Sequence, residues 1–536
     1  MINYKTALIS VYNKDGVVDF AKELKNLGWQ IYASAGTAKI LNKKGVKVKD
    51  VADVARGKAI LGHRVVTLSR KIHAGLLARN KKEDLNQLKK LNIPWIGLVC
   101  VDLYPLEEEI KKPDSTPQSV IKNTDIGGPA LLRSGAKGRR IVVSDSADKE
   151  KIISWLKKGQ PEKQKVLTAL AAKAEAIVAK YSLSSARYHS QNNYDGWIGK
   201  SKMDCFYGEN PWQEKASLFR NNALDDLDVA GFQIIEGLDL SYNNLCDIDR
   251  LLQSITHIAA GFDLNRNFVP NIAISVKHGN VCGASFGENS ESVLKRMIGS
   301  DPRAIFGGLV MTNFKIQPKE AKILTNYLIS NSKKRILDGI LAPAFSKEAI
   351  DLLKRENGKT RLMINPRLLS INKRSLDNKD RFRHIRGGFL KQSNYNYILD
   401  FKDKTLQKIN KTESQKEDDL LLAWAIGSTS NSNTITLVKN KQLISNAVAQ
   451  QDRVGACKLA IYKAKEANHK TIKASAYSDS FFPFVDGPKF LSKAGIKAIL
   501  ASSGSVNDSK IIDFCRQKNI NLYLIPDKKA RGFFGH

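Results

Sequence analysis

The chain has 536 residues, of which 42% are hydrophobic, so it is too long for one core and we expect two or three domains. No apolar run approaches the roughly 18 residues of a membrane-spanning helix, and the run at 7–11 is too short for a signal peptide, which predicts a cytoplasmic protein. The net charge of +33 comes from lysines spread along the whole chain. Because no basic block dominates, anionic small substrates are favoured over nucleic acid as partners.

Cysteine and histidine give no sign of a metal centre. The six cysteines and eight histidines are scattered, without the close spacings of a zinc site or a disulfide framework. We therefore expect no metal to be required for function.

Strand and helix patterns alternate through residues 1–145, which is typical of a parallel sheet in an α/β domain. Strands are expected at 7–11, 30–34, 95–103 and 141–144, with helices at 15–27, from 35 to 41 and from 125 onward. Residues 147–190 are predicted to be helical and are rich in charged residues. The stretch 191–204 has turn composition without periodicity, so we place the domain boundary there, giving domains 1–199 and 200–536. The second half resumes mixed α/β patterns, with a polar stretch at 402–418 expected to be solvated helix and loop.

The stretch Ser34-Ala35-Gly36-Thr37 follows a predicted strand and opens a helix. Free backbone N–H groups and the helix dipole favour a phosphate at such a position, and the hydroxyls of Ser34 and Thr37 would add donors. Arg64 and Thr67 could supply further contacts to the same phosphate. An ordinary helix cap explains the stretch equally well.

Three further residues of the N-terminal half are candidates for proton chemistry. Tyr104 ends a buried strand, Asp125 precedes a helix, and Lys137 lies within that helix. Each also has a purely structural explanation, since Asp125 can be simply the helix cap.

In the second half, the apolar run 271–276 reads as a buried strand that ends in Lys277-His278. Ligands of open α/β sheets bind outside the carboxyl ends of strands. A histidine can take a proton near neutrality, and a desolvated lysine can give one. A surface lysine beside a loop histidine is the commoner origin of such a pair.

Taken together, the motifs resemble those of the bifunctional purine-biosynthesis enzymes that combine AICAR transformylase with IMP cyclohydrolase. The matching stretches run in order along the whole chain: 34–39, 73–79, 103–105, 124–137, 207–211, 240–245, 276–278, 301–308, 432–433, 478–484 and His536. The resemblance implies a methylglyoxal-synthase-like parallel-sheet domain, followed by a transformylase region of two cytidine-deaminase-like α/β units. It also implies a homodimer that shares the transformylase sites.

The resemblance implies two reactions. A formyl group passes from 10-formyltetrahydrofolate, the cosubstrate, to the amine of AICAR, giving FAICAR, which then closes to IMP with loss of water. For formyl transfer the resemblance implies that His278, with His536 near it, acts as the base and that Lys277 donates a proton to the folate nitrogen. It implies that Asn433 donates a hydrogen bond to the oxygen of the tetrahedral intermediate. It places substrate contacts at Tyr207, Asn243, Asp301, Gly307, Gln450 and Arg453. For closure it implies Tyr104, Asp125 and Lys137, with the phosphate held by Ser34, Gly36, Thr37, Arg64 and Thr67.

Several motif positions differ from the usual family pattern. In the N-terminal half, Val66 replaces a lysine, Ser69 replaces a histidine and Asp102 replaces an asparagine. In the C-terminal half, Phe206 replaces an arginine, Trp212 replaces a histidine and Asn431 replaces a lysine. A lost cation and an added carboxylate both oppose an anionic substrate. We therefore expect formyl transfer to persist and ring closure to be reduced. Two alternatives stay open: a family member with impaired sites that serves as a nucleotide-binding or scaffold protein, and a basic nucleic-acid binder that reuses the fold.

Overall fold

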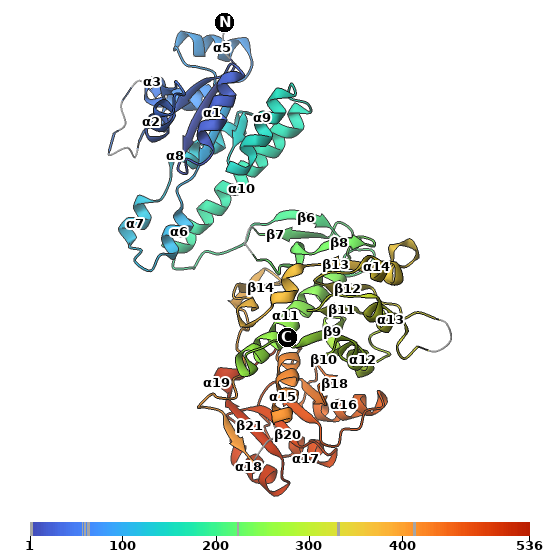
Figure 1. The fold of residues 1–536 in the computed structure, drawn as a ribbon. Helices are drawn as coiled ribbons and strands as arrows, with labels where there is room; N and C mark the ends of the chain where they lie inside the picture. The colour runs from blue at the N-terminus through green and yellow to red at the C-terminus, as the bar shows by residue number, and fades with distance from the viewer. Residues whose placement is uncertain are drawn as a thin grey trace. The chain divides into compact units, whose positions relative to one another are not determined.

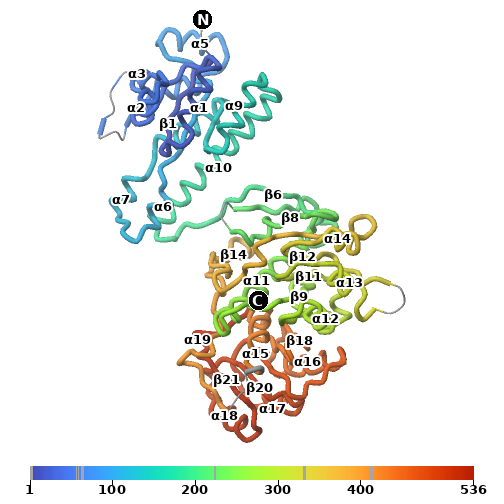
Figure 2. Tube along the Cα trace, in the orientation of Figure 1, coloured from blue at the N-terminus to red at the C-terminus, as the bar shows by residue number. Residues whose placement is uncertain are grey.

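The computed structural model describes residues 4–55, 57, 60–61, 65–221, 225–329, 333–410 and 414–535. The chain divides into two compact units, Met1–Gly199 and Lys200–His536 (Figures 1 and 2). Across the described ranges, no helix combines the length and the apolar character needed to cross a membrane.

The first unit is built on a five-stranded, wholly parallel sheet of order β3-β2-β1-β4-β5. The strands are β1 Thr6–Val11, β2 Gln30–Ala33, β3 Lys49–Asp50, β4 Leu98–Asp102 and β5 Ile141–Val143. The helices are α1 Val17–Asn26, α2 Ala35–Lys43, α3 Val51–Ala55, α4 Arg70–Leu77, α5 Lys82–Lys90, α6 Leu106–Lys111, α7 Pro117–Lys122, α8 Gly127–Lys137, α9 Lys149–Lys157 and α10 Lys163–His189. The predicted parallel sheet is therefore confirmed.

Alternation along β1 explains how this sheet is covered on both faces. Ala7 and Ile9 join one apolar core with α1 and α2, while Leu8 joins a second core with α4 and α8. Successive side chains of a strand point to opposite faces, so a continuously apolar strand needs helices on both sides.

The second unit is organised by a twelve-stranded mixed sheet of order β16-β21-β20-β19-β17-β18-β10-β9-β11-β12-β13-β8. Its strands are β8 Gln233–Glu236, β9 Asn271–Lys277, β10 Asn280–Gly287, β11 Leu309–Thr312, β12 Gly339–Ala342, β13 Arg361–Ile364, β16 Gln407–Ile409, β17 Ile435–Lys439, β18 Gln442–Ala447, β19 Ser475–Ser478, β20 Ala498–Ser503 and β21 Asn521–Pro526. The helices are α11 Tyr242–Arg266, α12 Ser290–Ser300, α13 Pro318–Asn326, α14 Lys347–Leu353, α15 Ser414–Gly427, α16 Arg453–Glu466, α17 Asp486–Lys493, α18 Asp508–Gln517 and α19 Asp527–Ala530. Two separate hairpins are β6 Lys200–Asp204 with β7 Ser217–Arg220, and β14 Asp380–Ile385 with β15 Gly388–Ser393.

This large sheet is an internal repeat. In the first half, the hairpin β9–β10 pairs antiparallel with β11, which is followed by parallel β12 and β13 and by antiparallel β8. In the second half, β17–β18, β19, β20, β21 and β16 have the same relations. The halves join where β10 pairs with β18. Helices α11 and α15, which precede the two hairpins, share one core on one face of the sheet (Figure 1).

Two local predictions are wrong. Residues 407–409, expected to be helix or loop, form the edge strand β16, and residues 200–204, expected to be a turn, form β6. Both segments are polar and largely exposed, so the sequence has no apolar alternation to mark them. Pairing with distant β21 and with β7 makes them strands.

Packing at the end of α15 yields a stability prediction. A Cβ added to Gly427 would overlap the ring of Tyr477 on β19 and lie 2.8 Å from Thr436 Oγ1. Overpacking of this kind costs about 1–3 kcal/mol. We expect Gly427→Ala to lower the thermal unfolding midpoint clearly. Gly388→Ala is the control, because its Cβ would meet nothing within 4 Å, and equal midpoints for the two variants would contradict the prediction.

Candidate functional site

The first candidate site lies at the carboxyl edge of the N-terminal sheet. Strand order reverses between β1 and β4, so the connections leaving these two strands diverge there. In open α/β sheets such a switch point is where ligands bind. The residues that follow β1, β2 and β4 therefore meet at one place.

The loop after β2 presents main-chain donors at this edge. Ser34 is the residue before α2, and its Oγ lies 3.4 Å from Thr37 Oγ1. Thr37 is fully buried and accepts a hydrogen bond from the Val11 N–H at 3.4 Å. A Cβ on Gly36 would meet nothing within 4 Å. The first N–H groups of α2 are thus open to an anion, while Thr37 also fixes the end of β1.

Asp125 is held at the start of α8. Its Oδ1 accepts a hydrogen bond from Gly128 N–H at 2.8 Å, and its own N–H donates to the Tyr181 hydroxyl at 2.6 Å. Burial raises the pKa of Asp125, and the negative charge of Asp102 raises it further. Hydrogen bonds from nearby main-chain amides lower the pKa and so oppose this rise. Asp125 thus both holds an amide of the first turn of α8 and supplies a partly buried carboxylate to the site.

Tyr104 faces the same carboxylate. Burial raises the pKa of its hydroxyl, and the charge of Asp125 raises it further. The ring packs edge-on against Tyr12, with centroids 5.6 Å apart. The Tyr104 hydroxyl therefore lies within the electrostatic influence of the Asp125 carboxylate.

Other predicted residues of this site have different outcomes. Thr67 lies against the start of α8, because a Cβ on Gly127 would be 2.6 Å from its Oγ1. Lys137 is exposed at the last residue of α8, about 15 Å along the helix axis from Gly127, so it is not brought to Asp125. Arg64 lies outside the described residues.

Sequence reasoning missed a lysine at this edge. The Lys14 ammonium donates to the main-chain oxygens of Val11 and, at 3.1 Å, of Tyr12. Burial lowers its pKa, and the charge of Asp102 opposes that change. Its position just after a strand was the available signal.

The second candidate site surrounds the turn of the β9–β10 hairpin. His278 and Gly279 have positive φ values of 52° and 71°, as a tight two-residue hairpin turn requires. Lys277 Nζ donates to the Phe306 carbonyl at 2.7 Å, and Gly279 N–H donates to Asp247 Oδ1 at 2.6 Å. The predicted pair thus stands at a strand end, fixed from both sides.

Two carboxylates beside this turn were not anticipated. Burial raises the pKa of Asp247, and the neighbouring His278 opposes the rise. Burial likewise raises the pKa of Asp338, which precedes β12, and Lys277 is among the cations that oppose it. Both the lysine and the histidine therefore interact electrostatically with a partly buried carboxylate.

Gly307 and Asp301 shape the loop opposite Lys277. Gly307 has a φ of 74°, and Lys277 Nζ lies 3.8 Å from where its Cβ would be. Asp301 Oδ1 accepts a hydrogen bond from Ala304 N–H at 3.0 Å and so closes the turn that leads to Gly307.

Near the start of α11, Asn243 Nδ2 donates to the Glu209 carbonyl at 3.1 Å. The Tyr207 carbonyl accepts from the main chain of Tyr242 at 3.0 Å.

Asn433 belongs to a neighbouring, tightly bonded group. Its Nδ2 donates to the Gln450 carbonyl at 2.8 Å, and its Oδ1 accepts from Arg453 Nη2 at 2.8 Å. Arg453 also forms an ion pair with Asp479, whose other oxygen accepts from Ser432 Oγ at 2.6 Å. The predicted residues Asn433, Gln450 and Arg453 are thus in direct contact.

The Lys277-His278 turn and the group around Asn433 lie at the same end of the strands of one sheet but are not in contact. From β9 to β17 the order runs through β10 and β18, three spacings of about 4.8 Å, or about 14 Å in all. His536 lies outside the described residues. The structure therefore aligns Lys277, His278 and Asn433, but does not place them in mutual contact.

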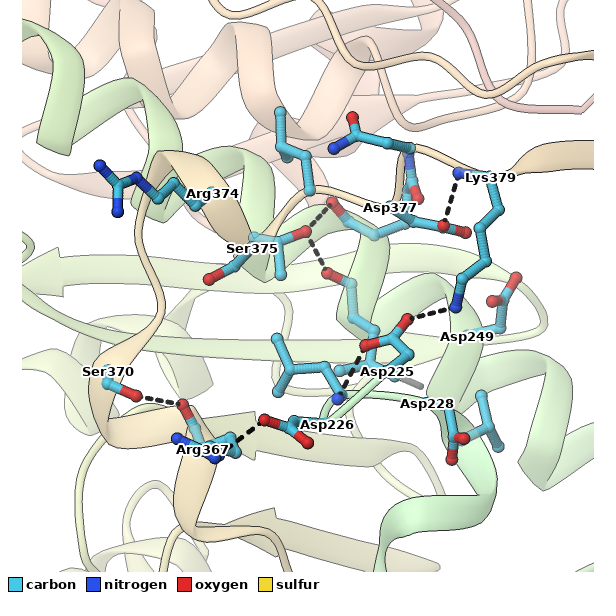
Figure 3. Close-up of a pocket in the computed structure, with 17 residues that line it drawn as sticks. Asp225, Asp226, Asp228, Asp249, Arg367, Ser370, Arg374, Ser375, Asp377 and Lys379 are labelled. Atoms are coloured by element: carbon cyan, nitrogen blue, oxygen red, sulfur yellow. Dashed lines mark hydrogen bonds and ion pairs between the residues drawn. The ribbon is translucent and has the colours of Figure 1, made fainter. Parts of the chain in front are cut away.

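A separate hollow of the second unit lies away from both of these groups (Figure 3). It has a volume of about 770 Å³, and five aspartates, Asp225, Asp226, Asp228, Asp249 and Asp377, line it. Two of its cations are already paired, Arg367 with Asp226 at 2.9 Å and Lys379 with Asp225 at 3.3 Å. Because carboxylates repel an anionic ligand, this hollow is a poor nucleotide site.

The ion pair behind Asn433 yields a second stability prediction. The Asp479 side chain is fully buried, so its removal leaves the Arg453 guanidinium buried without its carboxylate. Such a loss costs about 3–5 kcal/mol. We expect Asp479→Ala to lower the unfolding midpoint in urea strongly, whereas Asp351→Ala, which breaks an exposed pair with Lys354, should leave it nearly unchanged. A similar midpoint for both variants would refute the assignment of Asp479 as an organising residue.

Comparisons with known proteins identify the family of the chain. A model described as MGS-like domain matches residues 16–130, and one described as AICARFT/IMPCHase bienzyme matches residues 137–463. The bifunctional purine biosynthesis proteins PurH of Staphylococcus aureus strains bovine RF122 / ET3-1 and JH1 are each 33% identical over 524 residues, covering 97% of this chain and 98% of the relative. A solved structure, the crystal structure of ForH, is 32% identical and covers 35% of this chain and 99% of its own, with a TM-score of 0.32 that supports no argument on fold. The chain belongs to the family of the AICARFT/IMPCHase bienzyme.

Proposed function

We infer that this protein transfers the formyl group of 10-formyltetrahydrofolate to AICAR and closes the product to IMP, in purine biosynthesis. The observation that carries this inference is the identity of 33% to a bifunctional PurH protein over 97% of the chain. An isolated MGS-like domain would explain only the first unit. We assign ring closure to residues 1–199 and formyl transfer to residues 200–536.

For formyl transfer, we propose His278 as the base that takes a proton from the amine of AICAR. The amine is a poor nucleophile because its lone pair is delocalised into the ring, so proton removal must accompany attack. The carboxylate of Asp247 beside His278 would stabilise the imidazolium that forms. His536 is proposed to assist, on the resemblance alone.

Lys277 and Asn433 complete the proposed mechanism. Lys277, held against the Phe306 carbonyl, would protonate the departing folate nitrogen. Asn433 Nδ2 carries two N–H groups, and one donates to Gln450. The other would donate to the oxygen of the tetrahedral intermediate, where one such donor is typically worth about 3 kcal/mol in the barrier. We propose Tyr207, Asn243, Asp301, Gly307, Gln450 and Arg453 as the residues that shape and bind around the substrate.

For ring closure, the carboxamide nitrogen attacks a formyl carbon of the same molecule, so positioning supplies much of the rate. The first turn of α2, with Ser34, Gly36 and Thr37, is proposed to hold the phosphate together with Thr67 and Arg64. Tyr104 and Asp125, which influence each other electrostatically, are proposed to move protons as water leaves. Lys137 is a weaker candidate, because it lies at the far end of α8.

A second candidate function is that of a family member with weakened substrate binding, and three substitutions in the motifs support it. Phe206 and Trp212 stand where the resemblance expects an arginine and a histidine, and they are 61% and 78% exposed. Val66 removes a cation next to Thr67. These positions would lower affinity without removing the proton-transfer residues.

We further propose that the protein is a homodimer, as the resemblance implies. The hairpin β14–β15 exposes Phe389 and Leu390 by 41% and 56%, and a hairpin this exposed is a natural surface for a second copy. Light scattering at several concentrations would test it, and a mass of one chain throughout would exclude the dimer. The predicted cytoplasmic location stays a prediction.

The function is tested by two separate assays. Tetrahydrofolate formed from AICAR and 10-formyltetrahydrofolate reports transfer, and IMP formed from supplied FAICAR reports ring closure. Calorimetry with AICAR separates the alternatives, because binding without turnover indicates an impaired enzyme. Absence of AICAR binding together with salt-sensitive binding of oligonucleotides would instead favour a nucleic-acid binder.

Restoring a cation at position 66 should strengthen ring closure. Val66 is partly buried and precedes Thr67, which lies against the start of α8. We expect Val66→Lys to raise kcat/KM for FAICAR closure by about tenfold, since a positive charge attracts the anionic substrate. Leu68→Lys, two residues away and exposed, is the control. No gain in the first variant, or an equal gain in the control, would refute the effect of the lost lysine.

Neutralising Asp125 should separate stability from activity. Burial raises its folded-state pKa above the ordinary value, so the ionised group costs the folded state free energy at pH 7. Asparagine keeps an acceptor for Gly128 N–H without the charge. We expect Asp125→Asn to keep or raise the thermal midpoint at pH 7, with the difference fading as the pH falls below the ordinary pKa. Closure of FAICAR should slow by about 10²-fold. A lower midpoint at pH 7, or unchanged closure, would contradict this assignment.

A further inference from the structure

Helix α11 contacts both catalytic turns of the second unit from one face. Asp247 accepts the hydrogen bond from Gly279 in the Lys277-His278 turn. Three residues later, Arg250 Nη2 lies 3.3 Å from Asn431 Oδ1 and donates to it, two positions before Asn433. Residues three apart on a helix are neighbours on its surface. One helical turn therefore holds the two groups that otherwise lie about three strand spacings apart.

Arg250 is buried in a manner that only specific contacts explain. Its exposure is 7%, and its Nη2 also donates to the Phe534 carbonyl at 2.9 Å. Its Nη1 is buried and has no hydrogen-bond acceptor among the residues that the structure describes. The guanidinium lies 4.4 Å from the centroid of the Phe534 ring, and that of Arg381 lies 3.3 Å from the same ring. A buried arginine between a helix, a turn and the C-terminal segment is costly unless its charge or its donors are used.

The internal repeat shows that the fold does not require an arginine here. Asp419 is the sixth residue of α15, as Asp247 is the sixth of α11, and it accepts from the turn of the second hairpin at Lys441 N, 2.7 Å away. Three residues after Asp419, the position equivalent to Arg250 is Leu422, which is fully buried. The same structural place is thus filled by an apolar side chain in one half and by a guanidinium only in the half that carries the Lys277-His278 turn.

The charge of Arg250 lies beside a position where the usual motif has a lysine and this chain has none. Position 431 is a lysine in the usual pattern and an asparagine here, and Arg250 reaches the oxygen of that asparagine. Burial lowers the pKa of Arg250 to about 10, opposed by the carboxylate of Asp249, so the group is a cation at neutral pH. A positive charge therefore stands beside the Asn431–Asn433 turn even though residue 431 is neutral.

Resting on the proposed formyl transfer, we propose that Arg250 is a positioning residue of the transformylase site. Its guanidinium joins the Asn431–Asn433 turn to the main chain at Phe534 and supplies the cation that residue 431 does not. Arg250 thus acts through the Asn431–Asn433 turn rather than on the substrate, and α11 sets this turn relative to the Lys277-His278 turn.

The test uses the full-length protein and the formyl-transfer assay. Because Leu422 fills the equivalent place, Arg250→Leu should stay folded, with a thermal midpoint close to that of the natural chain. Its kcat should fall by about 10- to 100-fold with a smaller change in KM for AICAR, since misplacement of a catalytic group by about 1 Å can cost that much. Arg250→Lys should regain part of kcat, because an ammonium keeps the charge but cannot reach both acceptors.

A second substitution makes the test specific. Asn431→Lys combined with Arg250→Leu should restore kcat at least threefold over Arg250→Leu, because the cation returns from the other side of the contact. Asn431→Lys alone should lower kcat, since two like charges would meet. Arg296→Leu is the matched control: that arginine donates to Ser285 Oγ at 2.9 Å and the Phe286 carbonyl at 2.7 Å, toward the far end of β10. It should affect stability more than kcat.

The outcomes separate the two levels of inference. If the natural chain neither binds AICAR nor transfers the formyl group, the proposed function fails and this proposal falls with it. If the natural chain is active and Arg250→Leu has unchanged kcat, only the role of Arg250 is refuted. The same holds if kcat falls merely in step with the thermal midpoint, as for Arg296→Leu, or if Asn431→Lys gives no rescue.

Discussion

The pairing of β10 with β18 is the contact on which the second unit depends. Each half of the repeat is a set of six strands, and neither would bring a complete set of polar groups to one edge. Joined, they form one sheet whose order places the turn after β9 and the segment before β17 on the same side. Helices α11 and α15 then pack into one core over the junction. The alignment of Lys277, His278 and Asn433 is a consequence of that junction.

Both candidate sites follow one electrostatic design. Carboxylates are partly removed from water at the ends of strands or helices, as at Asp125 and Asp247, and burial raises their pKa values. Main-chain amides hold them in place: Gly128 for Asp125 and Gly279 for Asp247. Each faces a group able to exchange protons, the Tyr104 hydroxyl or the His278 ring. This suits two reactions that both move protons around a formyl carbon.

Much of the fold was predictable from patterns of local sequence. Continuous apolar runs marked β1 and β9, and the alternation of strand and helix marked the parallel sheet. The polar strands β6 and β16 were not predictable, because they are strands only through partners elsewhere in the chain. Among candidate site residues, the family motifs predicted Lys277, His278, Tyr104 and Asp125. They gave no signal for Asp338, which interacts electrostatically with Lys277, 61 residues away in sequence. Nor did they mark Arg250, which donates a hydrogen bond to Asn431, 181 residues away.

By itself, the sequence determined the class of fold, the family and the chemical types of residue available, since these are carried by periodicity and by ordered motifs. Only the tertiary structure decided which residues meet. Lys137 is separated from Asp125 by the length of α8, because each residue of a helix adds a fixed rise along its axis and Lys137 is the last residue of α8. The tertiary structure also brought Arg250 to Asn431, because packing of α11 against the sheet fixes a contact that no local pattern encodes.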